Sequence, residues 1–231
     1  MRLHLLLPTL LLALTTTAAP TPAQAQDAPR ERTEKLLSTF REIQPGKNLP
    51  APVAAANAKV IDRLDAAFDF EGITDAILAP RADKLLPADR ARFKAEFHAL
   101  IRAGTFVDTS AFFKKATLTF NPSATVAGAS TVAIHVAVPA EDNELDVGLV
   151  WRDVTPAAAV ALAGPAPKSP PAPPAPAIPP TPKIVDILVD GDSLVKDYQN
   201  QVAGIVDREG AAGLFAKLAE RRAQIDRAQV K

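Results

Sequence analysis

Three aspartates near the C-terminal end of the chain are the residues best suited to acid–base chemistry. Asp186 lies in an apolar, β-branched run that predicts a strand, and Asp190 and Asp192 flank Gly191 in the turn that follows. Asp186 and Asp190 are spaced for one strand face, so a carboxylate pair there could act in general acid–base catalysis. We favour the alternative, in which they are solvated strand-edge and helix-capping groups.

The histidines do not form a catalytic set, and the sequence has no cysteine. His98 lies on the polar side of its predicted helix or at its margin, and His135 faces away from the apolar side of its predicted strand, so we interpret both as surface residues. There is also no phosphate-binding glycine loop, no His-Glu-x-x-His motif and no cluster with metal-ligand spacing. We therefore expect no catalytic residues, no metal and no cofactor in a chain that is not an enzyme.

Length and charge limit the classes to which the protein can belong. A chain of 231 residues is long enough for one medium-sized domain with its own core. The formal net charge is zero, which argues against nucleic-acid binding, because proteins that bind nucleic acids usually carry a basic excess. We expect a monomer, and apolar surface remains as the candidate functional element.

The first 25 residues have the pattern of a signal peptide. Arg2 is followed by an apolar run over residues 3–14, and Ala23-Gln24-Ala25 matches a signal-peptidase site. The run is shorter than the roughly 20 residues that a transmembrane helix needs. We expect cleavage near Ala25, a periplasmic location, and a single domain over residues 26–231.

Helical spacing of apolar residues dominates the sequence up to residue 115. It predicts helices over residues 30–43 and 53–68, a short helix capped by Asp69, a helix that starts at Pro87, and a further helical turn. Most of the phenylalanines lie in this region, so the helices should present a large apolar face. The members of that face include Phe68, Phe70, Phe93, Phe97, Phe106, Phe112 and Phe113.

The pattern then changes to the period of two that is typical of strands. Alternation predicts strands over residues 115–120, 130–138, 144–153 and 183–189. A proline- and alanine-rich insert at about 156–182 separates the last two, and we interpret it as a disordered loop extension. The expected fold is α+β: an antiparallel sheet of about four strands, with amphipathic helices packed on one face and an apolar pocket between the layers.

The chain ends in an amphipathic helix that follows the last strand. Asp192 or Ser193 can cap it, and Leu194 and Tyr198 lie on its apolar face. Gly210 is expected to stop this helix before a second apolar stretch begins.

A sheet covered by such helices can hold a long apolar ligand between its layers. Each buried CH₂ contributes about 0.8 kcal/mol, so a lipid with two chains of roughly 16 carbons resists entering water by something on the order of 20 kcal/mol. Judged by face, the predicted lipid-binding pocket is lined by Phe70, Ile73, Phe93, Phe97, Leu100, Ile101, Ile134, Val136, Val147, Leu149, Trp151, Leu194 and Tyr198.

Several segments together resemble the MlaC-type periplasmic phospholipid-binding proteins, also called the toluene-tolerance family. They are residues 86–101, 149–152, 185–201 and 210–218, whose order and spacing match from about Phe70 onward. The matching positions are Pro87, Phe93, Phe97, Leu100, Ile101, Trp151, Asp186, Gly191, Ser193 and Leu194. The chain departs from the family in its proline-rich insert, which stands where a short hairpin turn is usual, and in its weakly matching N-terminal third.

The resemblance implies a carrier of phospholipid, or of a hopanoid-related lipid. Its partners would be an outer-membrane lipoprotein complex and an inner-membrane ABC transporter complex, and its role would be the maintenance of outer-membrane lipid asymmetry. Two alternatives come from the residues themselves. One is a non-catalytic interaction module that uses the proline-rich insert, and the other is a small pocket enzyme with Asp186 as its base.

Overall fold

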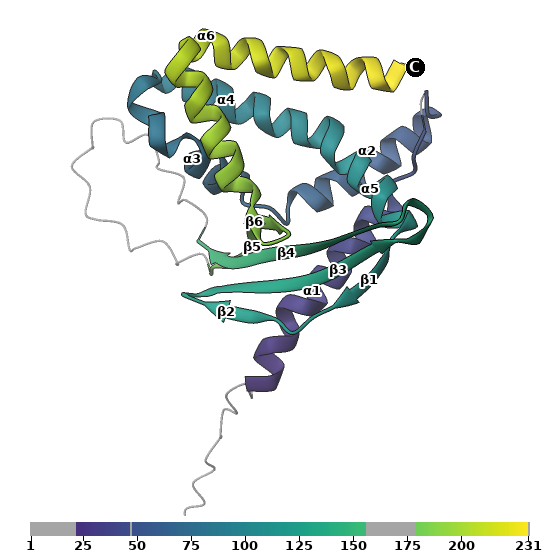
Figure 1. Cartoon of the computed structure of the whole chain (residues 1–231). Coiled ribbons are helices and arrows are strands. Elements are labelled where there is room, and N and C mark those ends of the chain that lie inside the picture. Colours follow the sequence, from purple (N-terminus) through teal and green to yellow (C-terminus); the bar gives the residue numbers. More distant parts are fainter. Residues whose placement is uncertain (1–21, 47, 156–178, 231) are drawn as a thin grey trace, which may run out of the picture.

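The structure is a computed structural model that describes residues 22–46, 48–155 and 179–230 (Figure 1). The predicted signal peptide lies almost wholly outside these residues, and so does the insert from residue 156 to residue 178. The described part of the chain forms a helical layer over one sheet. Its helices are α1 (Pro22–Glu42), α2 (Ala51–Asp65), α3 (Phe70–Leu78), the 3₁₀ helix η1 (Ala79–Lys84), α4 (Pro87–Leu100), the π-helical turn η2 (Ile101–Thr105), α5 (Phe106–Lys115) and α6 (Leu194–Val230).

The sheet is antiparallel throughout, which confirms the predicted α+β class. Its strands run in the order β1-β3-β4-β5-β6, and β2 pairs with the other end of β3. The four predicted strands are present, and two short ones, of three and two residues, were not predicted because they are too short to show alternation. The strands are β1 (Thr117–Phe120), β2 (Ala124–Val126), β3 (Ala129–Val138), β4 (Asn143–Val154), β5 (Thr181–Val189) and β6 (Asp192–Ser193), with a 3₁₀ turn, η3 (Pro139–Glu141), between β3 and β4.

Alternation along β3 explains why helices cover only one face. Val132, Ile134 and Val136 are fully buried, and the residues between them, such as His135, are partly exposed. The register with β4 extends the apolar face, because Ile134 lies opposite Val147.

The helices bury this face in two separate groups. In the first group, α1, α2 and α5 pack with the inward side chains of β3 and β4. In the second group, α3, α4 and α6 pack mainly against one another. Ile101, in the π-helical turn that joins α4 to α5, contacts both clusters. The protein therefore has two adjacent apolar cores over one sheet.

A β-bulge interrupts β5. Val150 pairs with Asp186, but the next residue of β4, Trp151, pairs with Ile184, so Val185 is an extra residue on β5. Pro182, which we expected to lie in the insert, instead belongs to β5 and pairs with Asp153. A proline is tolerated there because it lies near the start of the strand, beyond the reach of β6.

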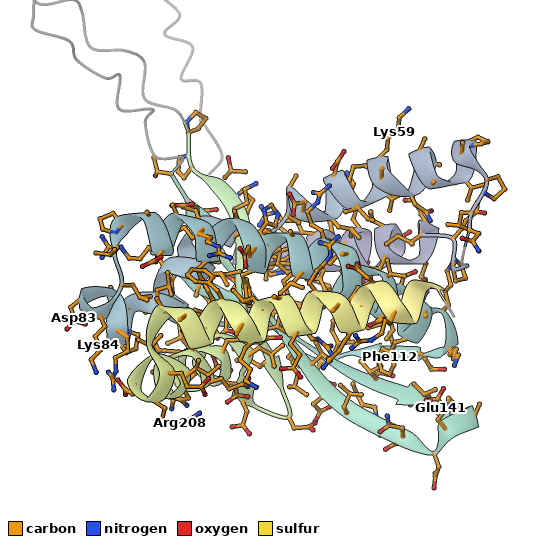
Figure 2. All side chains as sticks on the ribbon, turned by 90° about the horizontal axis from the view of Figure 1, so that it is seen from above. Lys59, Asp83, Lys84, Phe112, Glu141 and Arg208 are labelled. Carbon is orange, nitrogen blue, oxygen red and sulfur yellow. The ribbon has the colours of Figure 1, made fainter. Side chains whose placement is uncertain are left out.

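Gly210 bends α6 where a helix end was predicted. Its φ of 66° and ψ of −166° are outside the helical region, and glycine adopts such a conformation without the steric cost of a Cβ. Figures 1 and 2 show that the part of α6 after Gly210 runs along the helical layer, on the side away from the sheet.

Asp207 fastens the part of α6 before this bend to η1. Its carboxylate accepts hydrogen bonds of 2.6 Å from Arg81 Nε and Nη2 and from Lys84 Nζ. The hydrogen bonds from Arg81, and then that from Lys84, hold the pKa of the Asp207 carboxyl well below its usual range.

We expect an Asp207→Asn variant to be less stable at neutral pH, with a melting temperature lower by about 1–3 °C, because exposed ion pairs contribute little individually. The pKa of Asp207 is lower in the folded state than in the unfolded chain, where it is about 4, so the ionised carboxylate stabilises the folded state at pH values above about 4. This stabilisation is lost as the pH falls toward the pKa of the folded state. The difference from the wild type should therefore be constant between pH 5 and 7 and shrink below pH 4 in thermal melts.

The matched control is Asp226→Asn, which removes an exposed carboxylate that pairs with Arg222 on the same helix. This variant should lower the melting temperature less than Asp207→Asn does. A difference for Asp207→Asn that persists unchanged at pH 2 would contradict the assignment.

Candidate functional site

An apolar cavity of about 260 Å³ lies where the two cores meet above the sheet. Apart from Thr105, Thr109, Asp186 and the Tyr198 hydroxyl, its lining side chains are apolar. The lining residues are Leu36, Leu37 and Phe40 of α1, Phe68 of the α2–α3 linker, Phe70 and Ile73 of α3, Phe97 of α4, Ile101 and Thr105 of η2, Phe106, Thr109, Phe112 and Phe113 of α5, Val147 and Leu149 of β4, Asp186, Ile187 and Val189 of β5, and Leu194, Val195 and Tyr198 of α6.

Most of the residues predicted from the sequence to line a pocket do line this cavity. They come from helices on one side and strands on the other, as the face pattern indicated. They are Phe70, Ile73, Phe97, Ile101, Val147, Leu149, Leu194 and Tyr198.

Five of the predicted residues are instead packed in the cores, outside the cavity lining. Phe93 is fully buried and stacks on Phe97, which holds it inside the cluster of α3, α4 and α6. Leu100 is also buried, farther along α4. Ile134 and Val136 are fully buried in the cluster of the first helix group.

Trp151 is the fifth of these residues, and it lies near the N-terminal part of α1. Its indole Nε1 donates a hydrogen bond of 2.9 Å to Thr33 Oγ1. Thr33 Oγ1 in turn donates to the Pro29 carbonyl oxygen, also at 2.9 Å. These bonds give the tryptophan a structural role in attaching α1 to β4.

Two helical parts of the wall were not predicted to line the pocket, and neither were the β5 residues Ile187 and Val189. The first is the inward face of α1, represented by Phe40, and the second is α5 with Phe106, Thr109 and Phe113. Both carried a signal, because an apolar face was predicted over residues 30–43 and the phenylalanines of α5 belong to the aromatic cluster. The sequence did not indicate that these faces converge on Phe70 and Val147.

Aromatic rings form a connected wall on the helical side of the cavity. Phe106 contacts Phe40 and Phe68 with ring centroids 5.7 and 5.6 Å apart, and Phe68 contacts Phe70 at 5.5 Å. In the second helix group, Phe97 of α4 meets Tyr198 of α6 edge-to-face at 5.2 Å. Such pairs prefer tilted or edge-on geometries and give the wall shape as well as apolar surface.

Asp186, the candidate base, is engaged in capping α6. Its Oδ1 accepts hydrogen bonds from the Ile187 amide at 2.8 Å and the Val195 amide at 3.2 Å, and its Oδ2 accepts from Ser193 Oγ at 2.6 Å. Ser193 Oγ also accepts from the Lys196 amide at 3.0 Å, so the predicted serine cap is present. The bulge at Val185 turns Asp186 off the regular strand alternation toward this helix start.

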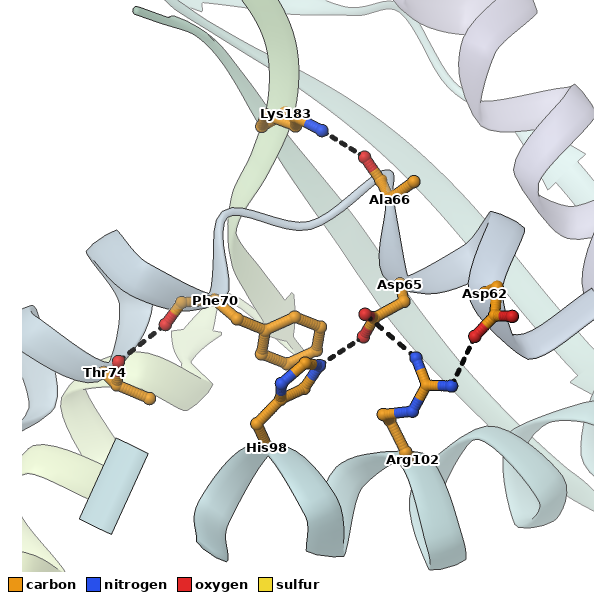
Figure 3. A network of polar contacts seen from close by, with 8 residues as sticks. All are labelled: Asp62, Asp65, Ala66, Phe70, Thr74, His98, Arg102 and Lys183. Atoms are coloured by element: carbon orange, nitrogen blue, oxygen red, sulfur yellow. Dashed lines mark hydrogen bonds and ion pairs between the residues drawn. The ribbon is translucent and has the colours of Figure 1, made fainter. Parts of the chain in front are cut away.

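A polar network lies beside the cavity wall (Figure 3). The His98 ring stacks on Phe70 with centroids 4.4 Å apart, and His98 Nε2 lies 2.5 Å from Asp65 Oδ1. Asp65 Oδ2 also accepts from Arg102 Nη1 at 2.9 Å, and Arg102 Nη2 reaches Asp62 at 2.5 Å. The network connects α2 to α4 and holds the Phe70 ring in position.

The described residues do not include a group of three or more side chains suited to holding a metal ion. Among the same residues, no helix combines the length and the apolar character needed to cross a membrane.

The fold is similar to that of a solved protein. The structure of the phospholipid-binding protein from Ralstonia solanacearum, in complex with a phospholipid, superposes with a TM-score of 0.56 and 18% sequence identity, covering 87% of this chain and 98% of that chain. At this identity the likeness shows a shared fold. No family model matches the chain, and no curated protein matches its sequence.

We expect Asp186→Ala to lower the free energy of unfolding by about 1–2 kcal/mol, because it removes the cap of α6 and leaves the Val195 amide without its acceptor. Urea denaturation measures this loss. The control is Asp192→Ala, which removes an exposed carboxylate of the same turn and should cost less than about 0.5 kcal/mol. Equal losses for the two variants would contradict the capping role.

Proposed function

We propose that this protein is a periplasmic carrier that binds the acyl chains of a phospholipid, or of a hopanoid-related lipid, in the cavity between its two cores. The main support for this proposal is the cavity itself, which is bounded by apolar side chains of both helix groups and of the sheet. Such a space excludes water from a hydrocarbon chain and offers no set of reactive groups around it. The fold that it shares with a protein solved with a bound phospholipid supports the same class of ligand.

The size of the cavity suggests how a lipid is accommodated. Sites for small molecules usually measure about 300–1,000 Å³, so the present space of about 260 Å³ is too small for two long acyl chains. The two clusters are packed separately and meet at Ile101, so they can move apart without exposing the interior of either one. Burial of about 0.8 kcal/mol per CH₂ group of lipid favours this separation.

The remaining parts of the proposal concern the protein's place in the cell. The apolar run and Ala23-Gln24-Ala25 site support export to the periplasm. There the carrier would move lipid between an outer-membrane lipoprotein complex and an inner-membrane ABC transporter complex, and so maintain lipid asymmetry of the outer membrane. We propose that it acts as a monomer. The engagement of both Asp186 oxygens in a helix cap supports a non-catalytic role.

A Thr109→Trp variant tests the cavity as the binding site. Thr109 lines the cavity from α5 and is only partly buried, so an indole there would occupy lipid space without replacing a core side chain. We expect uptake of fluorescent phosphatidylethanolamine from vesicles of phosphatidylethanolamine and phosphatidylglycerol to fall at least severalfold relative to the wild type.

The matched control is Thr125→Trp, which adds the same ring on the exposed strand β2. It should take up lipid as the wild type does, and circular dichroism should show both variants folded. Unchanged uptake by a folded Thr109→Trp variant would show that lipid does not use this cavity.

A further inference from the structure

A second, more open depression of about 560 Å³ lies between α3 and α4, on the outer side of the cavity wall. We name it the charged groove. Acidic side chains line it from α3 and basic ones from α4. Its charged members are Glu71 and Asp75 on α3 and Arg90, Lys94 and His98 on α4.

Phe70 is shared by the charged groove and the apolar cavity. It lines both spaces, so this aromatic residue stands at the boundary between them. His98 lies against Phe70 on the groove side (Figure 3). Thr74, which also lines the groove, donates a hydrogen bond of 2.6 Å to the Phe70 carbonyl oxygen. An amphipathic ligand with its chains in the cavity could therefore place its polar end in the groove.

The basic side of the groove is held in place. Lys94 forms ion pairs with Asp75, at 2.7 Å, and with Glu71. Burial alone would lower the pKa of Lys94, but the hydrogen bonds to Asp75 and Glu71 outweigh it and the pKa is raised, so the side chain stays cationic. Arg90 Nη1 donates to the Ala82 carbonyl oxygen at 2.9 Å, which fixes the direction of its guanidinium.

The acidic side of the groove is more exposed. The side chains of Glu71 and Asp75 are 72% and 60% exposed, whereas that of Lys94 is 23% exposed. A carboxylate has more acceptor sites than one ammonium can fill. Glu71 and Asp75 can therefore accept from a second cation that approaches from solvent.

We propose that the charged groove binds a lipid headgroup in which a phosphodiester is joined to a primary ammonium, with the phosphate toward Arg90 and Lys94 and the ammonium toward Glu71 and Asp75. Charges of both signs on opposite walls complement such a zwitterion better than a purely anionic headgroup. This inference rests on the proposed function, because the chains of the same lipid occupy the apolar cavity.

The test is a competition among lipids with identical acyl chains. The delipidated full chain is incubated with vesicles that contain equal amounts of phosphatidylethanolamine, phosphatidylglycerol and diacylglycerol, and the bound lipids are counted by native mass spectrometry. We expect phosphatidylethanolamine to exceed diacylglycerol by about tenfold, which is the scale of one charge-assisted hydrogen bond, and to exceed phosphatidylglycerol severalfold.

Two double variants should change these ratios in different ways. Arg90→Gln with Lys94→Gln should bring phosphatidylethanolamine and diacylglycerol to near parity. Glu71→Gln with Asp75→Asn should remove the preference for phosphatidylethanolamine over phosphatidylglycerol. It should keep the preference for both phospholipids over diacylglycerol. Because a folding defect would reduce all lipids together, the ratios report on the groove. Lys59→Gln, on the exposed side of α2 (Figure 2), is the control and should keep the wild-type ratios.

Two results would overturn the groove assignment and leave the carrier function intact. One is wild-type lipid ratios in both double variants. The other is binding of soluble glycerophosphoethanolamine as tight as that of the intact lipid, which would make the groove a site for free phosphodiesters. Absence of every lipid from the wild-type protein would overturn the proposed function as well.

Discussion

The need to bury the apolar face of β3, β4 and β5 governs the rest of this structure. Two helix groups cover that face, and because α4 continues into α5 through a π-helical turn, the groups stay connected without merging into one core. Gly104 in this turn packs closely against α6, since a Cβ there would lie 2.8 Å from Ile225 Cδ1, and the end of that side chain would have to move to admit a larger residue. The cavity is the space that remains where the groups meet, and π-helical turns often accompany functional sites of this kind.

Polar contacts hold the two groups together at the edge while their meeting surface stays apolar. Asp65 of α2, in the first helix group, binds both His98 of α4 and Arg102 of the π-helical turn. The linker between α2 and α3 is tied to the edge of β5 by backbone hydrogen bonds, from the Asp69 amide to the Ile184 carbonyl at 2.9 Å and from the Ile184 amide to the Ala67 carbonyl at 2.8 Å. These contacts fix the molecule at its periphery, and the proposed binding of lipid requires its interior boundary to widen.

Much of the fold follows from the sequence because apolar periodicity is strong in both layers. The alternation in β3 and the i, i+4 spacing of Phe93 and Phe97 each specified one face of one element. Periodicity shows which residues point inward, but it does not show which of those residues pack against other side chains and which border a cavity. Phe93 and Ile134 were therefore assigned to the pocket, although both are fully buried in the cores. The bulge that turns Asp186 toward α6 was likewise unpredictable, because an extra residue in a strand leaves no trace in its composition.

We infer that the boundary between the two cores holds lipid chains. The most direct measurement is solvent extraction, followed by mass spectrometry, of the protein purified from the cells that make it. We expect about one lipid per chain, released only when the protein is denatured or extracted. A folded protein that yields no stoichiometric lipid, and that takes none from vesicles, would contradict it.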